Sequence, residues 1–475
     1  MWSVVQFLPV ELNRYPCYAS TVKLPPLFND RVFYKNLFVI SFPIMLQNLV
    51  NSLVNMLDTV MIGQLGTVEI AAVGLGNQVF FFYNLTLFGI CSGASIFTAQ
   101  FWGKRDIRGI RMNTGFCLIL SLSVALIFSA AAFIMPARLI GFYSADPAVI
   151  KAGAVYLKTL APAFIPFAVN LVMVLTLRSV ERLRLAVVST VIALSMNALL
   201  NYLLIFGVGP FPAMGVAGAA TATVISRFTE MIIILSVSYI KKYPVAGSPK
   251  ELLGFTFPFV TRFIKIALPV IINEIIWSGG ITLHNAIMAR TGTAAIAAFN
   301  IVGTVSQLTW VVFMGLGNGV GVMIGKKIGE GNEAAARDYA SRIVRFAPLL
   351  AIGAALILLP LSRLTPLLFN VDEAVLAAVF SMFIVLCVSY PFRAFNMSMV
   401  IGVCRAGGDT VFCTVYDILF MWTISLPLAA AASFIFHAPV WLVYLFITME
   451  EPLKVILGYT RFRSGKWLHQ VTREL

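Results

Sequence analysis

Twelve long apolar stretches limit what this chain can fold into. A helix needs roughly 20 residues to cross the hydrocarbon of a bilayer, and each stretch is at least that long. The chain has 475 residues, of which 60% are hydrophobic and 11% charged, well above the roughly half-apolar usage of soluble domains. Membrane β-strands are shorter and alternate apolar with polar residues, so a barrel is excluded. We predict an all-α membrane protein whose twelve transmembrane helices lie at residues 36–63, 69–100, 114–142, 149–177, 186–207, 214–240, 264–290, 294–325, 342–362, 374–404, 411–437 and 438–460.

The distribution of Lys and Arg predicts the orientation of these helices. If the N-terminus lies inside the cell, the inner loops and both tails carry 27 Lys and Arg residues, against four near the outer side. Cytoplasmic loops are enriched in positive charge, so we expect a multi-pass protein of the inner or plasma membrane with both termini in the cytoplasm. The net charge of +14 is then mostly a topology signal that faces the anionic membrane lipids of the inner leaflet.

Other function classes find no support in the sequence. The basic residues are spread over many loops and form no stripe, so we expect no nucleic-acid partner. The six cysteines show no paired spacing, which indicates neither a disulfide framework nor a metal site. The glycine-rich run GLGNGVG at 315–321 lies inside an apolar stretch with no strand before it, so it is not a nucleotide fingerprint. We expect a secondary transporter and no enzyme.

An internal repeat divides the chain. Residues 61–73 read MIGQLGTVEIAAV, and 226 positions later residues 287–299 read IMARTGTAAIAAF. The same offset aligns further residues without a gap, so the sequence is an internal duplication. Because each half has an even number of spans, the two share one orientation, and their pseudo-twofold axis runs along the membrane normal. The predicted parts are a tail at 1–31, a six-helix bundle at 32–243, a linker at 244–263, a second six-helix bundle at 264–463 and a tail at 464–475.

Four motifs resemble those of the MATE (multidrug and toxic compound extrusion) transporters. They are the first-helix pattern Pro43-x14-Asp58-Thr59-x3-Gly63-x2-Gly66, the block GTVEIAAVG, the stretch GVAGAATATVISR at 215–227 and RAGGDT at 405–410. The resemblance covers about residues 32 to 463. It implies a V-shaped pair of six-helix bundles that alternates access and expels organic, often cationic compounds in exchange for protons or sodium ions. We expect no cofactor, and H⁺ or Na⁺ would be the coupling ion.

The first predicted helix has a polar face that cannot lie against lipid. Gln47, Asn51, Asn55 and Asp58 recur at steps of three and four residues, so they fall on one side of a helix. A carboxyl group withdrawn from water can bind and release a proton near working pH, which suits proton-coupled antiport. The position of Asp58 also resembles the first-helix Asp of the family. A structural Asp that only forms hydrogen bonds between helices is the alternative.

Asn197 and Asn201 lie four residues apart on one face of the fifth predicted helix. In one MATE branch a second acid partners the first-helix Asp at what looks like the Asn201 position. Here the residue is an amide, which leaves Asp58 with neutral partners as the cation-coupling site. An amide clamp between helices is the alternative reading of the two asparagines.

The second half offers a different set of candidates. A seventh-helix Glu resembles the cation or drug-charge site of NorM-like members, which pair it with a tenth-helix Asp; here that helix carries Arg393 and Asn396. Glu274 is then either a counter-ion to Arg393 or an anionic docking point for a cationic substrate, with Trp277 supplying a cation-binding face.

Three further candidates come from the repeat and the inner loops. His284 occupies the repeat-equivalent position of Asp58 and is either a titrating group or an ordinary hydrogen-bonded His. The pairs Arg178/Glu181 and Arg405/Asp409 lie in equivalent inner loops, where we expect structural contacts between loop residues.

Together these features predict a secondary antiporter that exports amphiphilic, cationic small molecules in exchange for H⁺ or Na⁺. Its partners are small-molecule substrates and membrane lipids, and a chain with both halves is expected to work as a monomer. The alternative is a lipid-precursor flippase of the wider superfamily, which would favour a cationic cavity.

Overall fold

The computed structural model describes residues 26–364 and 372–473, and this part of the chain is helical throughout, with one isolated β-bridge between Gly408 and Leu468. The first half, called the N-half, consists of α1 Arg31–Gly63, α2 Thr67–Lys104, α3 Ile107–Ile134, α4 Pro136–Gly141, α5 Pro147–Leu160, the short η2 Ala161–Ala163, α6 Phe164–Ser179, α7 Leu183–Phe206 and α8 Val216–Ile240.

The second half, called the C-half, follows a linker that contains the short helix α9 Pro249–Leu252. Its elements are α10 Phe257–Thr291, α11 Thr293–Gly329, α12 Glu333–Leu361, η3 Ser362–Leu364, α14 Glu373–Met397, the π-helical η4 Ser398–Arg405, α15 Thr410–Phe420, the π-helical η5 Met421–Ser425, α16 Leu426–Phe434, α17 Val440–Thr448 and α18 Glu450–Ser464.

The predicted all-α class with twelve spans in two bundles is confirmed. Ten helical stretches of the described chain are long and apolar enough to cross a membrane, and α10 and the α17–α18 pair take the places of the seventh and twelfth predicted spans. α10 begins at Phe257, inside the predicted linker, because Pro258 suits the first turn of a helix. The last span breaks at Met449, since Pro452 has no N–H to offer the carbonyl four residues earlier.

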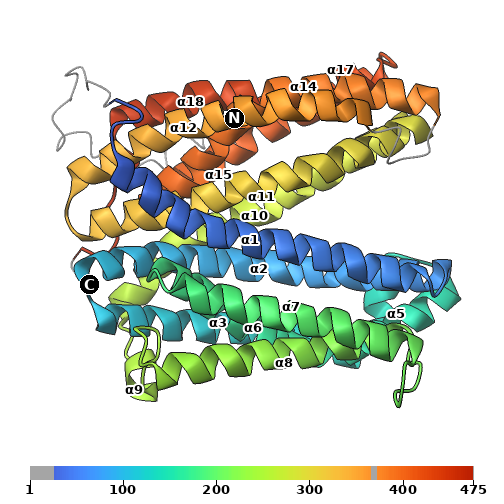
Figure 1. Ribbon diagram of the computed structural model, residues 1–475, viewed down its shortest axis with the longest axis horizontal. Helices are drawn as coiled ribbons and strands as arrows, with labels where there is room; N and C mark the ends of the chain where they lie inside the picture. Colours follow the sequence, from blue (N-terminus) through green and yellow to red (C-terminus); the bar gives the residue numbers. More distant parts are fainter. Residues whose placement is uncertain (1–25, 365–371, 474–475) are drawn as a thin grey trace.

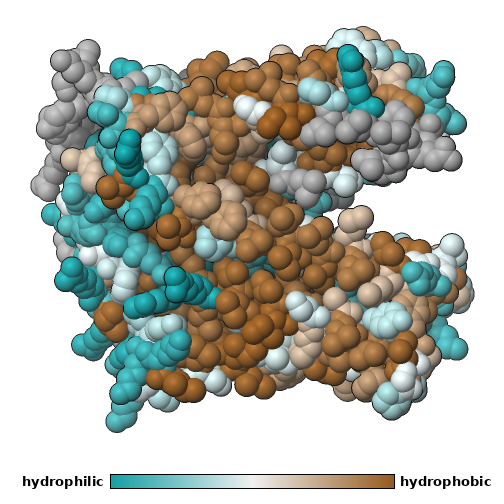
Figure 2. All heavy atoms as spheres, in the orientation of Figure 1, coloured by the Kyte–Doolittle hydropathy of each residue, from teal (hydrophilic) through white to brown (hydrophobic). Residues whose placement is uncertain are grey.

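The two halves form a V (Figure 1). At the left of the view the ends of α2 and α11 approach the start of α1, and at the right the halves diverge. We call the left side, where α2 ends at Lys104 and α11 ends at Gly329, the closed end, and the right side the open end. Figure 2 shows the notch between the halves at the open end and hydrophilic side chains gathered at the closed end.

The halves meet through glycines that the repeat relates to one another. A Cβ atom on Gly89 or Gly93 of α2 would lie closer than 3.0 Å to α10, and a Cβ atom on Gly315 or Gly319 of α11 would lie equally close to α1. Each contact has its counterpart at the offset of 226 residues, so α2 packs on α10 as α11 packs on α1. Small residues let helix backbones approach this closely. The duplicated sequence therefore produces a duplicated interface.

The closest approach lies at the closed end. A Cβ atom on Gly103 would collide with the backbone at Lys326, and one on the repeat-equivalent Gly329 would collide with the backbone at Gln100. The segment after α18 reinforces this contact, because the Gln100 side chain donates to the His469 carbonyl (3.1 Å) and accepts from the Val471 N–H (2.8 Å). The C-terminal segment thus lies against both halves where they meet.

Candidate substrate and cation site

A cavity of about 730 Å³ lies inside the N-half. Its walls come mostly from α1, α2, α6, α7 and α8, and α11 of the C-half adds Trp310, Met314 and Asn318. This volume matches that of sites for drug-sized ligands, which are typically about 300–1,000 Å³. We call it the N-half cavity.

Asp58 lies on the wall of the N-half cavity, held by an amide. The Nδ2 group of Asn201 on α7 donates to Oδ1 of Asp58 at 2.6 Å, and it also lies 3.5 Å from Oδ1 of Asn197. Asn197 in turn donates to Thr223 on α8 at 3.4 Å. Oδ1 of Asn201 is buried without a hydrogen-bond partner. The acid and the two amides predicted as a coupling site therefore form one hydrogen-bonded chain between α1, α7 and α8.

The polar face of α1 also turns to the N-half cavity. Gln47, Asn51 and Asn55 line it, as the helical spacing of the sequence requires. Gln47 is buried and donates to Thr190 at 2.7 Å, while its Oε1 accepts from Arg178 at 2.5 Å. The polar side of α1 is thereby fixed to α6 and α7.

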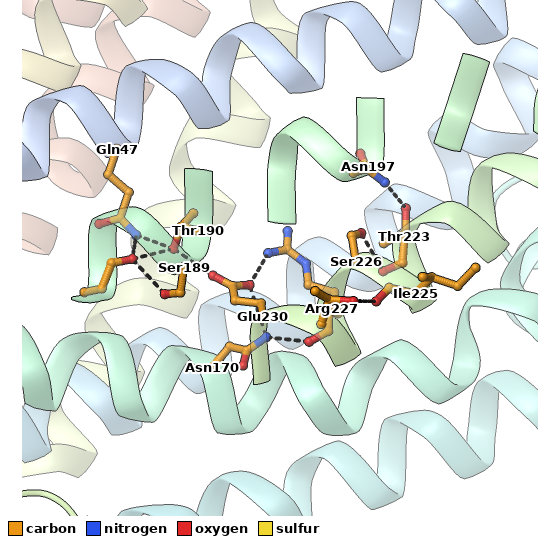
Figure 3. A network of polar contacts seen from close by, with 12 residues as sticks. Gln47, Asn170, Ser189, Thr190, Asn197, Thr223, Ile225, Ser226, Arg227 and Glu230 are labelled. Atoms are coloured by element: carbon orange, nitrogen blue, oxygen red, sulfur yellow. Dashed lines mark hydrogen bonds and ion pairs between the residues drawn. The ribbon is translucent and has the colours of Figure 1, made fainter. Parts of the chain in front are cut away.

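A second carboxylate, Glu230 on α8, lies on the same cavity wall. It accepts from Thr190 (2.7 Å) and Asn170 (3.1 Å) and pairs with Arg227 at 3.0 Å. Figure 3 shows this network, which continues from Glu230 through Thr190 to Gln47. Glu230 is only 2% exposed, so its charge is balanced by Arg227 and by hydrogen bonds inside the bundle.

Arg227 connects the two acids of the N-half cavity. Its guanidinium group lies over the ring of Phe167, 5.2 Å from the centroid, and it interacts electrostatically with Asp58. Asp58, in contrast to Glu230, forms no ion pair within 4.0 Å among the described residues. The cavity thus holds one carboxylate that is paired with Arg227 and a second, Asp58, that accepts from an amide.

Aromatic side chains form the apolar part of the wall. Phe80, Phe81, Trp310 and Met314 all face the cavity. Their neighbours Phe82 and Tyr83 do not line it: Phe82 is 47% exposed, and Tyr83 is completely buried among the helices. The helical period explains this split, since consecutive residues of α2 point in different directions.

In the C-half, Glu274 pairs with a different arginine from the one expected. Its Oε1 lies 2.7 Å from Nη2 of Arg405, and both residues are buried. The expected counter-ion, Arg393, instead donates to Ser306 (3.3 Å) and lies 3.9 Å from Glu451. Arg405 is the last residue of η4, which continues α14, and its side chain reaches Glu274 on α10.

The remaining C-half candidates are also engaged with other partners. Asn396 donates to Oε2 of Glu451 at 2.7 Å and accepts from Tyr416 at 2.5 Å. His284 is 3% exposed, and its Nε2 lies 3.0 Å from Oγ of Ser425. Trp277 packs against the hydrophobic core of the C-half. Arg393 and Asn396 therefore share one partner, Glu451, while Glu274, His284 and Trp277 contact other groups.

The inner-loop pairs are rearranged relative to the expectation. Asp409 forms a bidentate ion pair with Arg461 of α18, at 2.7 and 3.0 Å. Arg405, its expected partner, pairs with Glu274. Glu181 pairs with Lys326 of the C-half at 2.8 Å. Charges at loop ends thus serve contacts between elements and between halves. Sequence proximity alone gives no information about which elements meet.

Several charged residues of the spans were missed in the sequence. Arg227 and Glu230 lie three residues apart inside the sixth predicted span. Their charges could have drawn attention to them, because charged side chains are costly inside a membrane and often mark functional sites. The twelfth predicted span likewise contains Glu450 and Lys454; Lys454 is 3% exposed and lies 3.6 Å from Asp417.

Comparison with known proteins agrees with this architecture. The MatE family model matches residues 43–203 and 269–431, two regions that begin 226 residues apart. The probable multidrug resistance protein NorM of Thermotoga maritima is 24% identical over 441 residues, which cover 91% of this chain and 93% of the relative. Multidrug and toxin extrusion protein 1 of Oryctolagus cuniculus is 22% identical, over 84% of this chain and 69% of the relative.

Solved structures support the same fold. A multidrug resistance MATE family transporter of the MOP superfamily, in an outward-facing conformation, superposes with a TM-score of 0.82 at 19% identity, over 91% of this chain and 97% of the other. The two family-model regions together span more than half of the chain, both bundles included. The protein therefore belongs to the MATE family of multidrug efflux transporters.

Proposed function

We propose that this protein exports amphiphilic organic cations in exchange for protons, and that Asp58 is the residue for which the two compete. The observation that carries the proposal is a carboxylate on an aromatic-walled cavity of about 730 Å³, held by a neutral amide and by no ion pair within 4.0 Å in the described chain. A carboxylate in this state accepts either a proton or the positive group of a ligand.

The character of the cavity supports a cationic, partly apolar substrate. Phe80, Phe81 and Trp310 offer ring faces, which attract cations through their electron-rich surfaces and also contact apolar groups. Met314 adds a flexible side chain that adapts to ligands of different shape. Glu230 is already balanced by Arg227, so the ligand's charge is directed to Asp58.

The exchange of substrate for a proton follows from their competition for Asp58 and from the V-shaped arrangement of the two halves. At the open end the cavity meets the outer side, where a proton on Asp58 displaces the substrate. After the halves rock and the closed end opens, the proton leaves and a new substrate binds. One chain supplies both halves, so the working unit is a monomer.

The orientation in the membrane belongs to the same proposal. The basic loops at the ends of α2 and α11 lie at the closed end, together with the segment after α18. By the positive-inside rule this side faces the cytoplasm of a cell-membrane protein, and the open end faces outward.

Sodium is the second candidate for the coupling ion. The Oδ1 atom of Asn201 is buried, has no hydrogen-bond partner and belongs to the side chain that donates to Asp58. A carbonyl oxygen beside a carboxylate is the kind of ligand that hard cations prefer.

The test is transport of ethidium by the purified protein in liposomes, with a proton gradient or a sodium gradient imposed separately. We expect the proton gradient to drive ethidium movement in the wild type and in Glu333→Gln, which changes an exposed acid far from the cavity, and we expect Asp58→Asn to abolish it. Movement driven only by sodium, and lost in Asp58→Asn, would make sodium the coupling ion. Movement of a lipid-linked solute with no ethidium transport would favour the flippase.

A further inference from the structure

A second, smaller cavity lies between the two halves. Its volume is about 50 Å³, and it adjoins the N-half cavity, because Leu175, Arg178 and Asn318 line both. Its polar lining comes from both halves, namely Ser92 and Ser95 of α2, Arg178 and Ser179 of α6, Asn318 of α11 and Arg405 of η4. We call it the interface cavity.

Arg178 brings an unbalanced positive charge to the interface cavity. Its Nη2 donates to the neutral side chain of Gln47, and its Nε is buried without a partner. No carboxylate lies within 4.0 Å of it among the described residues. The nearby acids Glu181 and Glu230 are already paired with Lys326 and Arg227.

Arg405 adds a second guanidinium group but no net charge. Its Nη2 is paired with Glu274 at 2.7 Å, while its Nη1 points to Oγ of Ser92 on the N-half at 3.5 Å. The interface cavity therefore has two arginines and one carboxylate around it, which leaves a single positive charge. A buried charge without a counter-ion is unfavourable, so an anion of unit charge is the complement that this site lacks.

The size of the cavity limits the anion. A volume of about 50 Å³ admits a few water molecules or a monatomic ion with a water molecule. The hydroxyl group of Ser92 and the second N–H of the Asn318 amide are further hydrogen-bond donors for such an ion, whereas Ser95 and Ser179 already donate to backbone carbonyls.

We propose that the interface cavity binds one monovalent inorganic anion, such as chloride, through Arg178 and Arg405. Because the two arginines belong to different halves, the site is complete only while the closed end is shut. The anion stabilises the outward-open form and leaves when the halves separate, since a ligand favours the conformation that it binds better.

The test is thermal unfolding of the purified full-length protein in detergent, in sodium bromide, chloride or gluconate at equal ionic strength. In the wild type we expect bromide and chloride to raise the unfolding temperature by a saturating amount over gluconate, as binding to the folded state requires. Crystals grown in bromide should show the ion between Arg178 and Arg405.

Variants separate binding from a general salt effect. Arg178→Gln should lose the halide-dependent shift, whatever its unfolding temperature in gluconate, since this variant also loses the hydrogen bond to Gln47. The matched control Arg184→Gln, at an exposed arginine, should keep the wild-type shift. If Arg178→Gln does not fold, Arg178→Lys keeps the charge and should retain a weaker shift.

Two results would overturn the proposal. They are equal unfolding temperatures of the wild type in bromide and gluconate, and an undiminished halide shift in Arg178→Gln. Bromide found only at other places in the crystals would have the same meaning.

Discussion

Replacing Gly329 by alanine should force the two halves apart at the closed end. A Cβ atom at this position would lie closer than 3.0 Å to the carbonyl oxygen of Gln100 and to its backbone carbons, and backbone atoms cannot rotate away as a side chain can. The helices must therefore separate, or the closed end must open. The variant disfavours the outward-open form specifically, because this contact exists only where the closed ends meet.

The size of the effect follows from the cost of overpacking. Adding a methyl group to a tightly packed contact typically costs about 1–3 kcal/mol. If that cost falls on the outward-open form alone, the ratio of the two conformations changes by roughly 5- to 150-fold. Gly103→Ala, the repeat-equivalent change, meets the backbone at Lys326 and should act in the same direction.

The assay is a distance measurement between spin labels at Arg108 and Glu333, which are exposed at the closed end on opposite halves. The wild type should give one short distance between the labels. Gly329→Ala should give a longer distance, either in addition to the short one or in its place. Gly303→Ala is the matched control on the same helix, because a Cβ atom there meets nothing within 4 Å. An unchanged distance distribution in Gly329→Ala would refute the reasoning.

Three further predictions concern charges. Glu274→Gln leaves the buried guanidinium of Arg405 unbalanced, so it should lower the free energy of unfolding by about 3–5 kcal/mol in thermal or denaturant unfolding; an unchanged unfolding temperature would contradict the pairing. Glu181→Gln removes a partly exposed ion pair between the halves and should cost only about 0.2–1 kcal/mol in the same assay, so a loss as large as that of Glu274→Gln would be inconsistent with its exposure. Hydrogen bonds from the backbone and side chain of Ser248, together with an arginine, lower the pKa of Glu251 in the linker from 4.5 to about 2. The contribution of Glu251 is therefore fully present above pH 4.5 and lost as the pH falls towards 2, which hydrogen exchange of the α9 amides should show and Glu251→Gln should abolish.

The helices and the relation between the two halves could be predicted because both follow from patterns in the sequence itself. Long apolar runs locate the spans, although α12 begins at Glu333 and not at the predicted residue 342. The offset of 226 residues pairs Gly93 with Gly319 before any contact is known. Even the polar side of α1 follows from helical spacing, since Gln47, Asn51 and Asp58 all reach the N-half cavity.

The partners of charged residues could not be predicted in the same way. Arg393 lies in α14 and Arg405 ends η4, and only the packing of these helices decides that Glu274 meets Arg405. Glu230 depends on Thr190 and Asn170 from two other helices, which no spacing within α8 reveals. Which charged residues pair depends on how the helices are rotated against one another. The functional roles of these residues stay predictions.

The central claim, that a substrate cation and a proton compete for Asp58, is tested most directly by counting protons during binding. Ethidium would be added to the purified protein in weakly buffered detergent, and the pH change and the bound dye would be measured together. We expect the wild type to release up to one proton per ethidium bound under conditions where Asp58 is protonated, and Asp58→Asn to bind ethidium without releasing a proton. Proton release of equal size in the wild type and in Asp58→Asn would contradict the account.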